Sequence, residues 1–142
     1  MAYTEKQKSN IVDVVCAQVI LGKTLRAAFE SQGISSITFY KWLEQDEEKA
    51  KQYARARDIE ADLMADEIKN IADSTKDDIV IDENGNEVIN HNVIQRDRLR
   101  VDARKWLMSK RAPKKYGDKQ NIDLTTKGEH LIFNPLDLDV RE

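Results

Sequence analysis

Apolar residues recur at helical spacing in the first part of the chain. Between residues 9 and 22 they fall mostly three or four apart, at Ile11, Val12, Val15, Val19 and Ile20. Ser9 or Asn10 can cap such a helix, and Gly22 can end it. The pattern therefore predicts a first helix that starts after one of these two caps.

Two shorter helices are expected next. Thr24 can cap a helix over residues 25–31, and Gly33 can supply a sharp turn after it. Ser35 or Ser36 can cap a third helix, whose inward face carries the residues Phe39, Trp42 and Leu43. Three short capped helices, the last two joined by a turn, predict a helix-turn-helix unit over residues 1–46.

The outward face of the third helix is the candidate DNA-binding site. In a helix-turn-helix unit this helix enters the major groove, and its N-terminal outward residues meet bases and phosphates. We expect these to be Ser36, Thr38, Tyr40 and Lys41, assisted by Lys6, Lys8, Lys23 and Arg26. The competing interpretation is a plain three-helix bundle, because residues 1–46 hold five bases and five acids and have no net positive charge.

The segment from 47 to 74 contains no Gly or Pro and is rich in Ala, which predicts one long helix. Its apolar positions spread wider than one stripe, so we expect one face to pack within the chain and one against a neighbouring copy. The expected contacts between copies are Tyr53, Ile59, Leu63, Met64, Ile68 and Ile71.

Two runs of β-branched residues, 79–81 and 88–89, lie on either side of Asn84 and Gly85. This pattern predicts a β-hairpin with a type I′ turn, in which both central residues have positive φ. The hairpin would lie at the far end of the long helix. We expect it to be a connector.

A basic amphipathic helix is expected over residues 92–111, where Leu99, Ala103, Trp106 and Leu107 form one stripe. Pro113 stops it. With the preceding long helix it makes an antiparallel helical hairpin over residues 47–112. We expect Trp106 to be its apolar anchor, and Leu99, Trp106 and Leu107 to join the contacts between copies.

Charge is strongly segregated along a chain of net charge -3. Residues 47–90 hold six bases and thirteen acids, a net charge of -7, whereas residues 91–119 hold ten bases and three acids, a net charge of +7. The basic block can therefore bind nucleic acid or pair with the acidic helix before it. We favour pairing for 96–111, and keep Lys114, Lys115 and Lys119, in the loop after Pro113, as auxiliary DNA contacts.

Alternating apolar residues after Gly117 predict short strands, around 122–126 and 131–133, within a C-terminal segment 113–142 that ends in an acidic tail. Isolated strands are marginal in water, so we expect them to need partners from other copies. Charged residues make up 35% and aromatic residues 6% of the chain. This leaves little apolar material for a self-sufficient core, which also favours oligomerisation.

Several kinds of chemistry lack support in the sequence. Cys16 is the only cysteine and has apolar neighbours, so we expect a core residue. His91 and His130 lack ligand spacing, and we expect no metal and no cofactor. No phosphate-binding loop and no nuclease-like carboxylate cluster occurs, so we expect no catalytic residue. No apolar run suits a signal peptide or a membrane helix, and we expect a soluble, cytoplasmic protein.

Three stretches resemble the small terminase subunits of tailed double-stranded-DNA bacteriophages. They are ITFYKWLEQD (37–46), YARARDIEADLMADEIKNIAD (53–73) and, most specific of the three, RLRVDARKWLMSKRAPKKYGDK (98–119). The resemblance covers roughly residues 33 to 119.

The resemblance implies a non-enzymatic subunit that recognises the packaging-initiation site on viral double-stranded DNA. It implies regulation of a large terminase subunit, which carries the ATPase and nuclease. It also implies a homo-oligomeric ring of roughly 8–10 copies, with helix-turn-helix units outside and C-terminal strands in an intersubunit β-barrel. Such a protein acts in the cytoplasm of the bacterial host and is absent from the mature virion. Two alternatives remain open: a dimeric helix-turn-helix transcriptional regulator, and a scaffold or adaptor that does not bind DNA.

Overall fold

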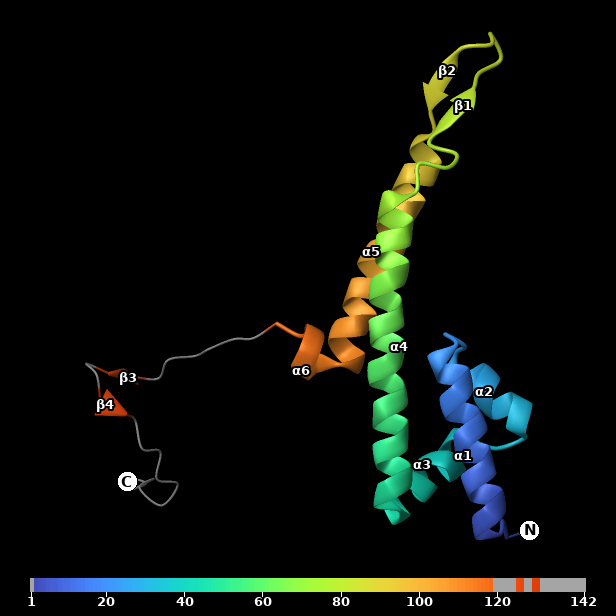
Figure 1. Cartoon of the computed structure of the whole chain (residues 1–142), viewed down its shortest axis with the longest axis vertical. Coiled ribbons are helices and arrows are strands. Elements are labelled where there is room, and N and C mark those ends of the chain that lie inside the picture. Colours follow the sequence, from blue (N-terminus) through green and yellow to red (C-terminus); the bar gives the residue numbers. More distant parts are fainter. Residues whose placement is uncertain (1, 119–124, 127–128, 131–142) are drawn as a thin grey trace, which may run out of the picture.

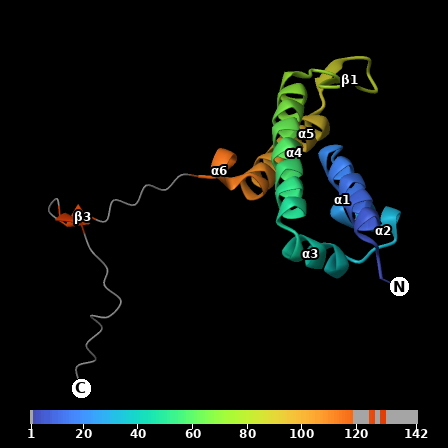
Figure 2. The same cartoon turned by 60° about the horizontal axis from the view of Figure 1, so that its bottom comes forward.

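The computed structural model describes residues 2–118, 125–126 and 129–130, and the fold is mainly helical, as predicted. Within these residues the helices are α1 (Glu5–Ile20), α2 (Leu25–Gln32), α3 (Ser36–Gln45), α4 (Glu47–Asp73), α5 (His91–Arg111) and α6 (Pro113–Tyr116). The strands are β1 (Ile79–Ile81), β2 (Glu87–Ile89), β3 (Thr125–Thr126) and β4 (Glu129–His130). In Figures 1 and 2, α1 lies alongside α4, and α3 crosses near the start of α4.

The first three helices share one apolar core. Its fully buried members include Val12, Val15, Val19 and Phe39, and the rings of Phe29 and Phe39 are 5.0 Å apart. Ala56 of α4 belongs to the same core, so the unit is completed by the first turns of the long helix. The three-helix unit is therefore held against α4 by apolar burial.

Helix α1 begins earlier than predicted, and the expected cap at Ser9 or Asn10 is wrong. The Thr4 hydroxyl accepts from the backbone N–H of Gln7 at 3.3 Å, and the Gln7 side chain accepts from the backbone N–H of Thr4 at 2.9 Å. The cap of this reciprocal capping box, Thr4, lies about two turns before Ile11, where the apolar pattern begins. Nothing between Thr4 and Asn10 breaks the helix, so it extends back to the box.

The other caps in this unit are confirmed. The hydroxyl of Thr24 accepts from Ala27 N at 3.3 Å at the start of α2, and that of Ser35 accepts from Thr38 N at 3.1 Å at the start of α3. Gly33 ends α2 with φ 62°, a left-handed conformation that suits glycine. These local signals set the turn between α2 and α3.

Helices α4 and α5 run antiparallel and lie side by side, and the predicted helical hairpin is confirmed (Figure 1). Ala61, Met108 and Ala112 are buried between α4 and the end of α5, and Met64, Ala65, Ile68 and Tyr116 pack around them. α5 ends at Arg111, before Pro113, which starts the single turn of α6.

The stripe of Leu99, Ala103 and Trp106 on α5 does not face α4. Leu99 is 68% exposed and Trp106 is 61% exposed, so Trp106 does not anchor the helix within the chain. Instead Met108 is buried, and Arg104 and Arg111 turn toward α4, where they pair with Glu67 and Glu60. The face of α5 that meets α4 therefore carries these two arginines together with Met108.

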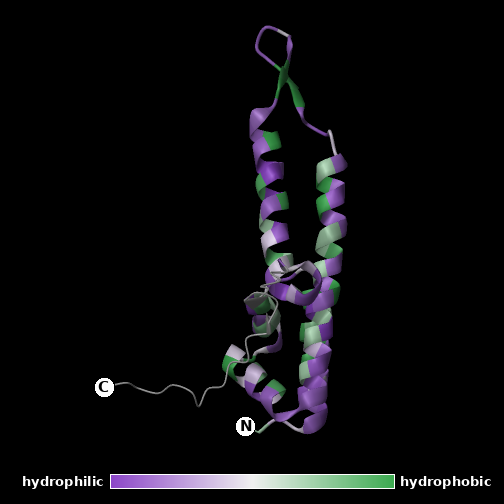
Figure 3. Cartoon of the chain, turned by 90° about the vertical axis from the view of Figure 1, so that its left-hand side faces the viewer, coloured by the Kyte–Doolittle hydropathy of each residue, from purple (hydrophilic) through white to green (hydrophobic). Residues whose placement is uncertain are grey.

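Strands β1 and β2 form the predicted hairpin beyond the ends of the long helices, with Ile79 opposite Ile89 (Figure 3). The expected type I′ turn is wrong, because only Gly85 in the loop has positive φ, at 82°. Asp82 organises the loop instead: its side chain accepts from the N–H groups of Asn84 and Asn86, both at 2.8 Å. The Asp82 carboxylate thus takes the place of a backbone carbonyl in the turn, and Asn84 does not need the positive φ that a type I′ turn requires.

Strands β3 and β4 pair antiparallel, with Thr126 opposite Glu129. β3 lies within the predicted strand 122–126, whereas β4 lies just before the predicted strand 131–133. The remaining positions of the predicted strands, 122–124 and 131–133, and the tail lie outside the described residues. None of the helices described is both long enough and apolar enough to cross a membrane.

Candidate nucleic-acid interface

The outward face of α3 carries the candidate interface. Phe39 and Trp42 are buried in the core, and the Ser35 cap fixes the first turn. The helix therefore exposes the opposite face, on which lie Ser36, Ile37, Tyr40, Lys41 and Glu44. An exposed hydroxyl, a phenol and an ammonium group on one rigid helix can donate to phosphate oxygens and base edges.

Thr38 is the exception among the four predicted residues of α3. It is half-buried, and its hydroxyl shares a hydrogen bond with the hydroxyl of Ser35 at 2.9 Å. Its backbone N–H is also bound by the Ser35 cap. Thr38 is thus part of the structure that starts the helix.

Arg26 lies near the exposed face of α3. A groove of about 480 Å³ between α2 and α3 is lined by Leu25, Arg26, Phe29, Glu30, Ile34, Ser36 and Tyr40. The Arg26 side chain is 89% exposed and only loosely paired, with its Nε 3.6 Å from Glu30. Exposed ion pairs of this kind contribute little, so the guanidinium can turn to another anion.

The lysines predicted to assist are spread around the unit. Lys8 pairs with Glu5 at 2.6 Å and lies by a pocket that Trp42, Gln45 and Lys49 also line, at the opposite end of α3. Lys6 and Lys23 are exposed. The structure therefore brings Arg26 together with Ser36 and Tyr40, and it places Lys8 elsewhere.

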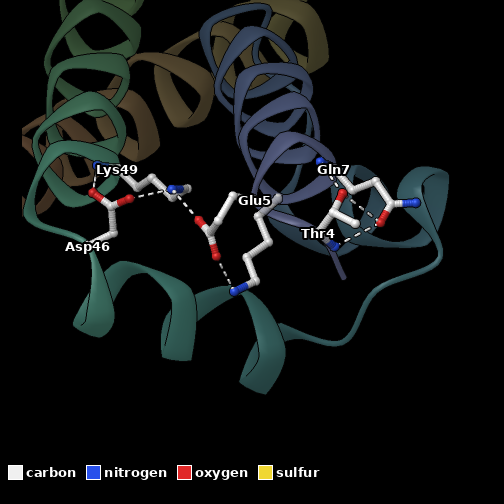
Figure 4. A network of polar contacts seen from close by, with 6 residues as sticks. Thr4, Glu5, Gln7, Asp46 and Lys49 are labelled. Carbon is white, nitrogen blue, oxygen red and sulfur yellow. Dashed lines mark hydrogen bonds and ion pairs between the residues drawn. The ribbon is translucent and has the colours of Figure 1, made fainter. Parts of the chain in front are cut away.

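A charged network joins the starts of α1 and α4 (Figure 4). Lys49 is almost completely buried; it pairs with Asp46, and its Nζ lies 3.5 Å from a carboxylate oxygen of Glu5. The Lys49 hydrogen bond lowers the pKa of Asp46, and Asp46 in turn raises the pKa of Lys49. The pKa of Glu5 is lowered mainly by its hydrogen bond from Lys8. The network fixes the three-helix unit on the long helix that carries it.

Tyr53 makes a second connection between α3 and α4. Its ring lies 5.4 Å from that of Phe39 and 6.3 Å from that of Tyr40, and its hydroxyl accepts from Arg57. Burial, reinforced by the Tyr40 hydroxyl, raises the pKa of Tyr53 to about 12. Tyr53, one of the residues predicted to contact a neighbouring copy, thus packs on the core of its own chain.

Three side chains of the basic block pair with acids of α4. Arg104 Nε lies 2.6 Å from Glu67, Arg111 pairs with Glu60, and Lys115 Nζ lies 2.6 Å from Asp62. Lys114 and Lys115 lie in α6 and not in a loop as expected, and only Lys114 of the two lacks an ion pair among the residues described. Lys119 lies outside them. Of the described bases of the block, Arg104, Arg111 and Lys115 therefore pair with the acidic helix α4.

The remaining predicted contact residues lie along the hairpin. Leu63, at 42%, Leu99 and Trp106 are exposed, and Lys110 lies over the Trp106 ring, 5.7 Å from its centroid. The half-buried members are Ile59, Met64, Ile68, Ile71 and Leu107. Exposed aromatic and aliphatic side chains of this size are available to a partner.

No group of three or more potential metal ligands occurs within the described parts of the chain. Cys16 is buried, and burial raises the pKa of its thiol to about 11, which keeps it protonated near neutral pH. The predicted role of Cys16 as a core residue is confirmed.

Ile37 and Lys49 lie at or next to the candidate interface but are not among the residues singled out from the sequence. Ile37 is 80% exposed on the outward face of α3, and the same helical period that buries Phe39 and Trp42 predicts this position. Lys49 is buried, and no local pattern distinguishes it from the other lysines of α4.

Comparison with known proteins gives a consistent picture. The family model described as "Bacteriophage Sf6, terminase small subunit-like" matches residues 7–123. Crystal structures of single-residue variants of the terminase small subunit gp1 of the bacterial virus Sf6 are 29% identical to this chain. Two of them have TM-scores of 0.56 and cover 89% of this chain and 91% of theirs. A third has a TM-score of 0.55 and covers 89% and 86%. No curated protein matches the chain.

Proposed function

Since the chain belongs to the bacteriophage Sf6 terminase small subunit-like family, we propose that it recognises viral double-stranded DNA where genome packaging begins. The DNA-binding surface is the outward face of α3. We further propose that it regulates the large terminase subunit, which supplies the ATPase and nuclease, and has no catalytic role itself. It acts in the cytoplasm of the infected bacterial host.

One observation carries the DNA-binding part of this proposal. Ser36, Tyr40 and Lys41 are exposed on one face of α3 while Phe39 and Trp42 bury the other, and Arg26 lies across the adjoining groove. A helix supported in this way can enter the major groove without rearrangement of the core. Lys41 and Arg26 supply phosphate contacts, and Ser36 and Tyr40 supply hydrogen bonds.

A single copy binds DNA weakly, because the unit has few unpaired cations on this face. A ring of copies overcomes this weakness by raising the effective concentration of the remaining sites once the first is bound. The exposed side chains Leu63, Leu99 and Trp106 support contacts between copies, with Ile59, Met64, Ile68, Ile71 and Leu107 at their margins. On this account residues 1–46 bind DNA, 47–112 assemble the ring, and 113–142 add strands from each copy to a shared barrel.

The test combines DNA binding with a mass measurement on the same preparation. The full chain is titrated against duplex fragments that tile the packaging region of the phage genome, with base-shuffled duplexes of equal length as controls. We expect one fragment to bind at least tenfold more tightly than its shuffled control, and native mass spectrometry to give a closed ring. Equal affinity for all fragments would contradict recognition, and a dimeric mass would favour a transcriptional regulator.

A further inference from the structure

Ile37 is the most exposed large apolar side chain of the described residues, at 80%. It lies in the first turn of α3, whose Ser35 cap is formed and whose buried face carries Phe39 and Trp42. Its neighbours one turn further along are Tyr40 and Lys41, which are also exposed. The residue at the centre of the candidate interface is therefore aliphatic.

The chemistry of the major groove restricts what such a side chain can contact there. The edges of the base pairs present hydrogen-bond donors and acceptors, and one apolar group, the C5-methyl of thymine. The N-terminal outward residues of a recognition helix are those that reach base edges. An isoleucine at this position can make no hydrogen bond, and it matches only the methyl group.

The side chains around Ile37 favour DNA over a protein partner. Lys41 and Ser36 border it on α3, Glu44 lies two turns further along, and Arg26 lies beyond the groove beside Glu30. The lysine, serine and arginine suit phosphate and base edges. The other strongly exposed apolar side chains Leu99 and Trp106 are on the helical hairpin and not beside Ile37.

We propose that Ile37 determines specificity by contact with a pyrimidine C5-methyl group in the major groove, that of a thymine in the recognised sequence. This inference rests on the proposed function, since it requires that α3 enters the groove. It predicts that the contact is lost when either the thymine methyl group or the Ile37 side chain is removed, so that removal of the methyl group no longer weakens binding once the side chain is gone.

The probe is a duplex selected by the full chain from a random library of unmodified synthetic DNA. Each thymine of the selected duplex is then replaced in turn by deoxyuridine, which lacks only the methyl group. We expect one position at which the replacement weakens binding about fourfold. This factor corresponds to about 0.8 kcal/mol, the free energy gained by burial of one methylene-sized group.

The same duplexes are measured with Ile37→Ala and, as a matched control, Leu21→Ala. Leu21 is 77% exposed and lies outside α3. Ile37→Ala should abolish the difference between thymine and deoxyuridine at that one position, whereas Leu21→Ala should preserve it. Both side chains are exposed, so neither variant should alter the circular dichroism spectrum.

The outcomes separate the inference from the proposed function. If no duplex is enriched, both fail. If a duplex is bound but the effect of deoxyuridine is the same in the wild-type chain and Ile37→Ala, the inference alone is overturned. A loss of ring mass in Ile37→Ala with unchanged discrimination would assign the side chain to a protein contact and would likewise overturn it.

Discussion

Glu60 of α4 and Arg111 of α5 form an ion pair across the helical hairpin, and the Glu60 side chain is only 4% exposed. The pair joins the acidic and basic halves of the chain next to the small core of Ala61, Met108 and Ala112. A charge buried to this extent is tolerated because its partner is present. Loss of the partner leaves it without compensation.

Arg111→Ala should therefore destabilise the folded chain. We expect the free energy of unfolding to fall by about 3 kcal/mol, because Glu60 would be left buried and unpaired. Urea unfolding followed by circular dichroism measures this change, at one fixed protein concentration because assembly also contributes. Lys105→Ala is the control, since Lys105 is exposed and has no ion pair among the residues described. Equal unfolding midpoints for the two variants would contradict the role of the pair.

The attachment of α6 to α4 should depend on pH. The Asp62 carboxylate accepts from Lys115 Nζ and from the Tyr116 hydroxyl, each at 2.6 Å. These bonds, that of Lys115 first, lower the pKa of Asp62 below its ordinary 3.8, whereas Asp62 raises the pKa of Lys115 and of Tyr116. Because its pKa is lowered, the ionised Asp62 carboxylate stabilises the contact at pH values above 3.8, and this stabilisation is lost as the pH falls through the pKa of Asp62 in the folded chain. Because their pKa values are raised, protonated Lys115 and Tyr116 stabilise the contact at pH values below about 10, and this stabilisation is lost as the pH rises through their pKa values in the folded chain.

Hydrogen exchange of the Tyr116 amide, which donates to Ala112 O at 2.9 Å, reports this attachment. At neutral pH the wild-type chain should exchange more slowly there than Asp62→Asn, and the difference should disappear at pH values well below 3.8. Equal exchange at neutral pH would show that the contact does not hold α6. A difference that persists in acid would show that the carboxylate charge is not its cause.

Trp106 should matter for assembly and not for the fold of one copy. Its side chain is 61% exposed, and Lys110 lies over its ring. Tryptophans are common among interface hot spots, whose truncation costs about 2 kcal/mol or more, so Trp106→Ala should weaken association by roughly thirtyfold. Native mass spectrometry over a dilution series would detect smaller species at concentrations where the wild-type chain and Lys105→Ala remain assembled. An unchanged mass distribution would remove Trp106 from the interface.

Local signals made much of the fold predictable. Thr24 and Ser35 cap their helices through hydroxyls a few residues from the N–H groups they bind, and Gly33 turns the chain because its φ is positive. Such contacts are contained in a short window of sequence. The start of α1 shows the limit of periodicity, because the capping box at Thr4 precedes the first apolar residue of the helix.

The rotation of α5 could not be predicted, because two stripes of that helix are plausible inward faces. Leu99 and Trp106 form the more apolar one, yet Arg104 and Arg111 turn inward to reach acids 37 and 51 residues earlier in the chain. Contacts over such separations leave no mark on local periodicity. The candidate site shows a related limit. Candidates chosen because their side chains are polar include Ser36 and Lys41 but not Ile37, which is recognised only from its exposure in the structure.

Whether α3 binds DNA is decided by the salt dependence of DNA affinity in Lys41→Ala and Lys114→Ala. Both lysines are exposed, one on α3 and the other on α6. If Lys41 neutralises a phosphate, its removal should weaken binding and reduce the slope of log K against log salt by about one for each engaged copy. Lys114→Ala should retain the wild-type slope. The opposite result, an unchanged slope in Lys41→Ala and a reduced one in Lys114→Ala, would place the DNA on the basic block and contradict the account.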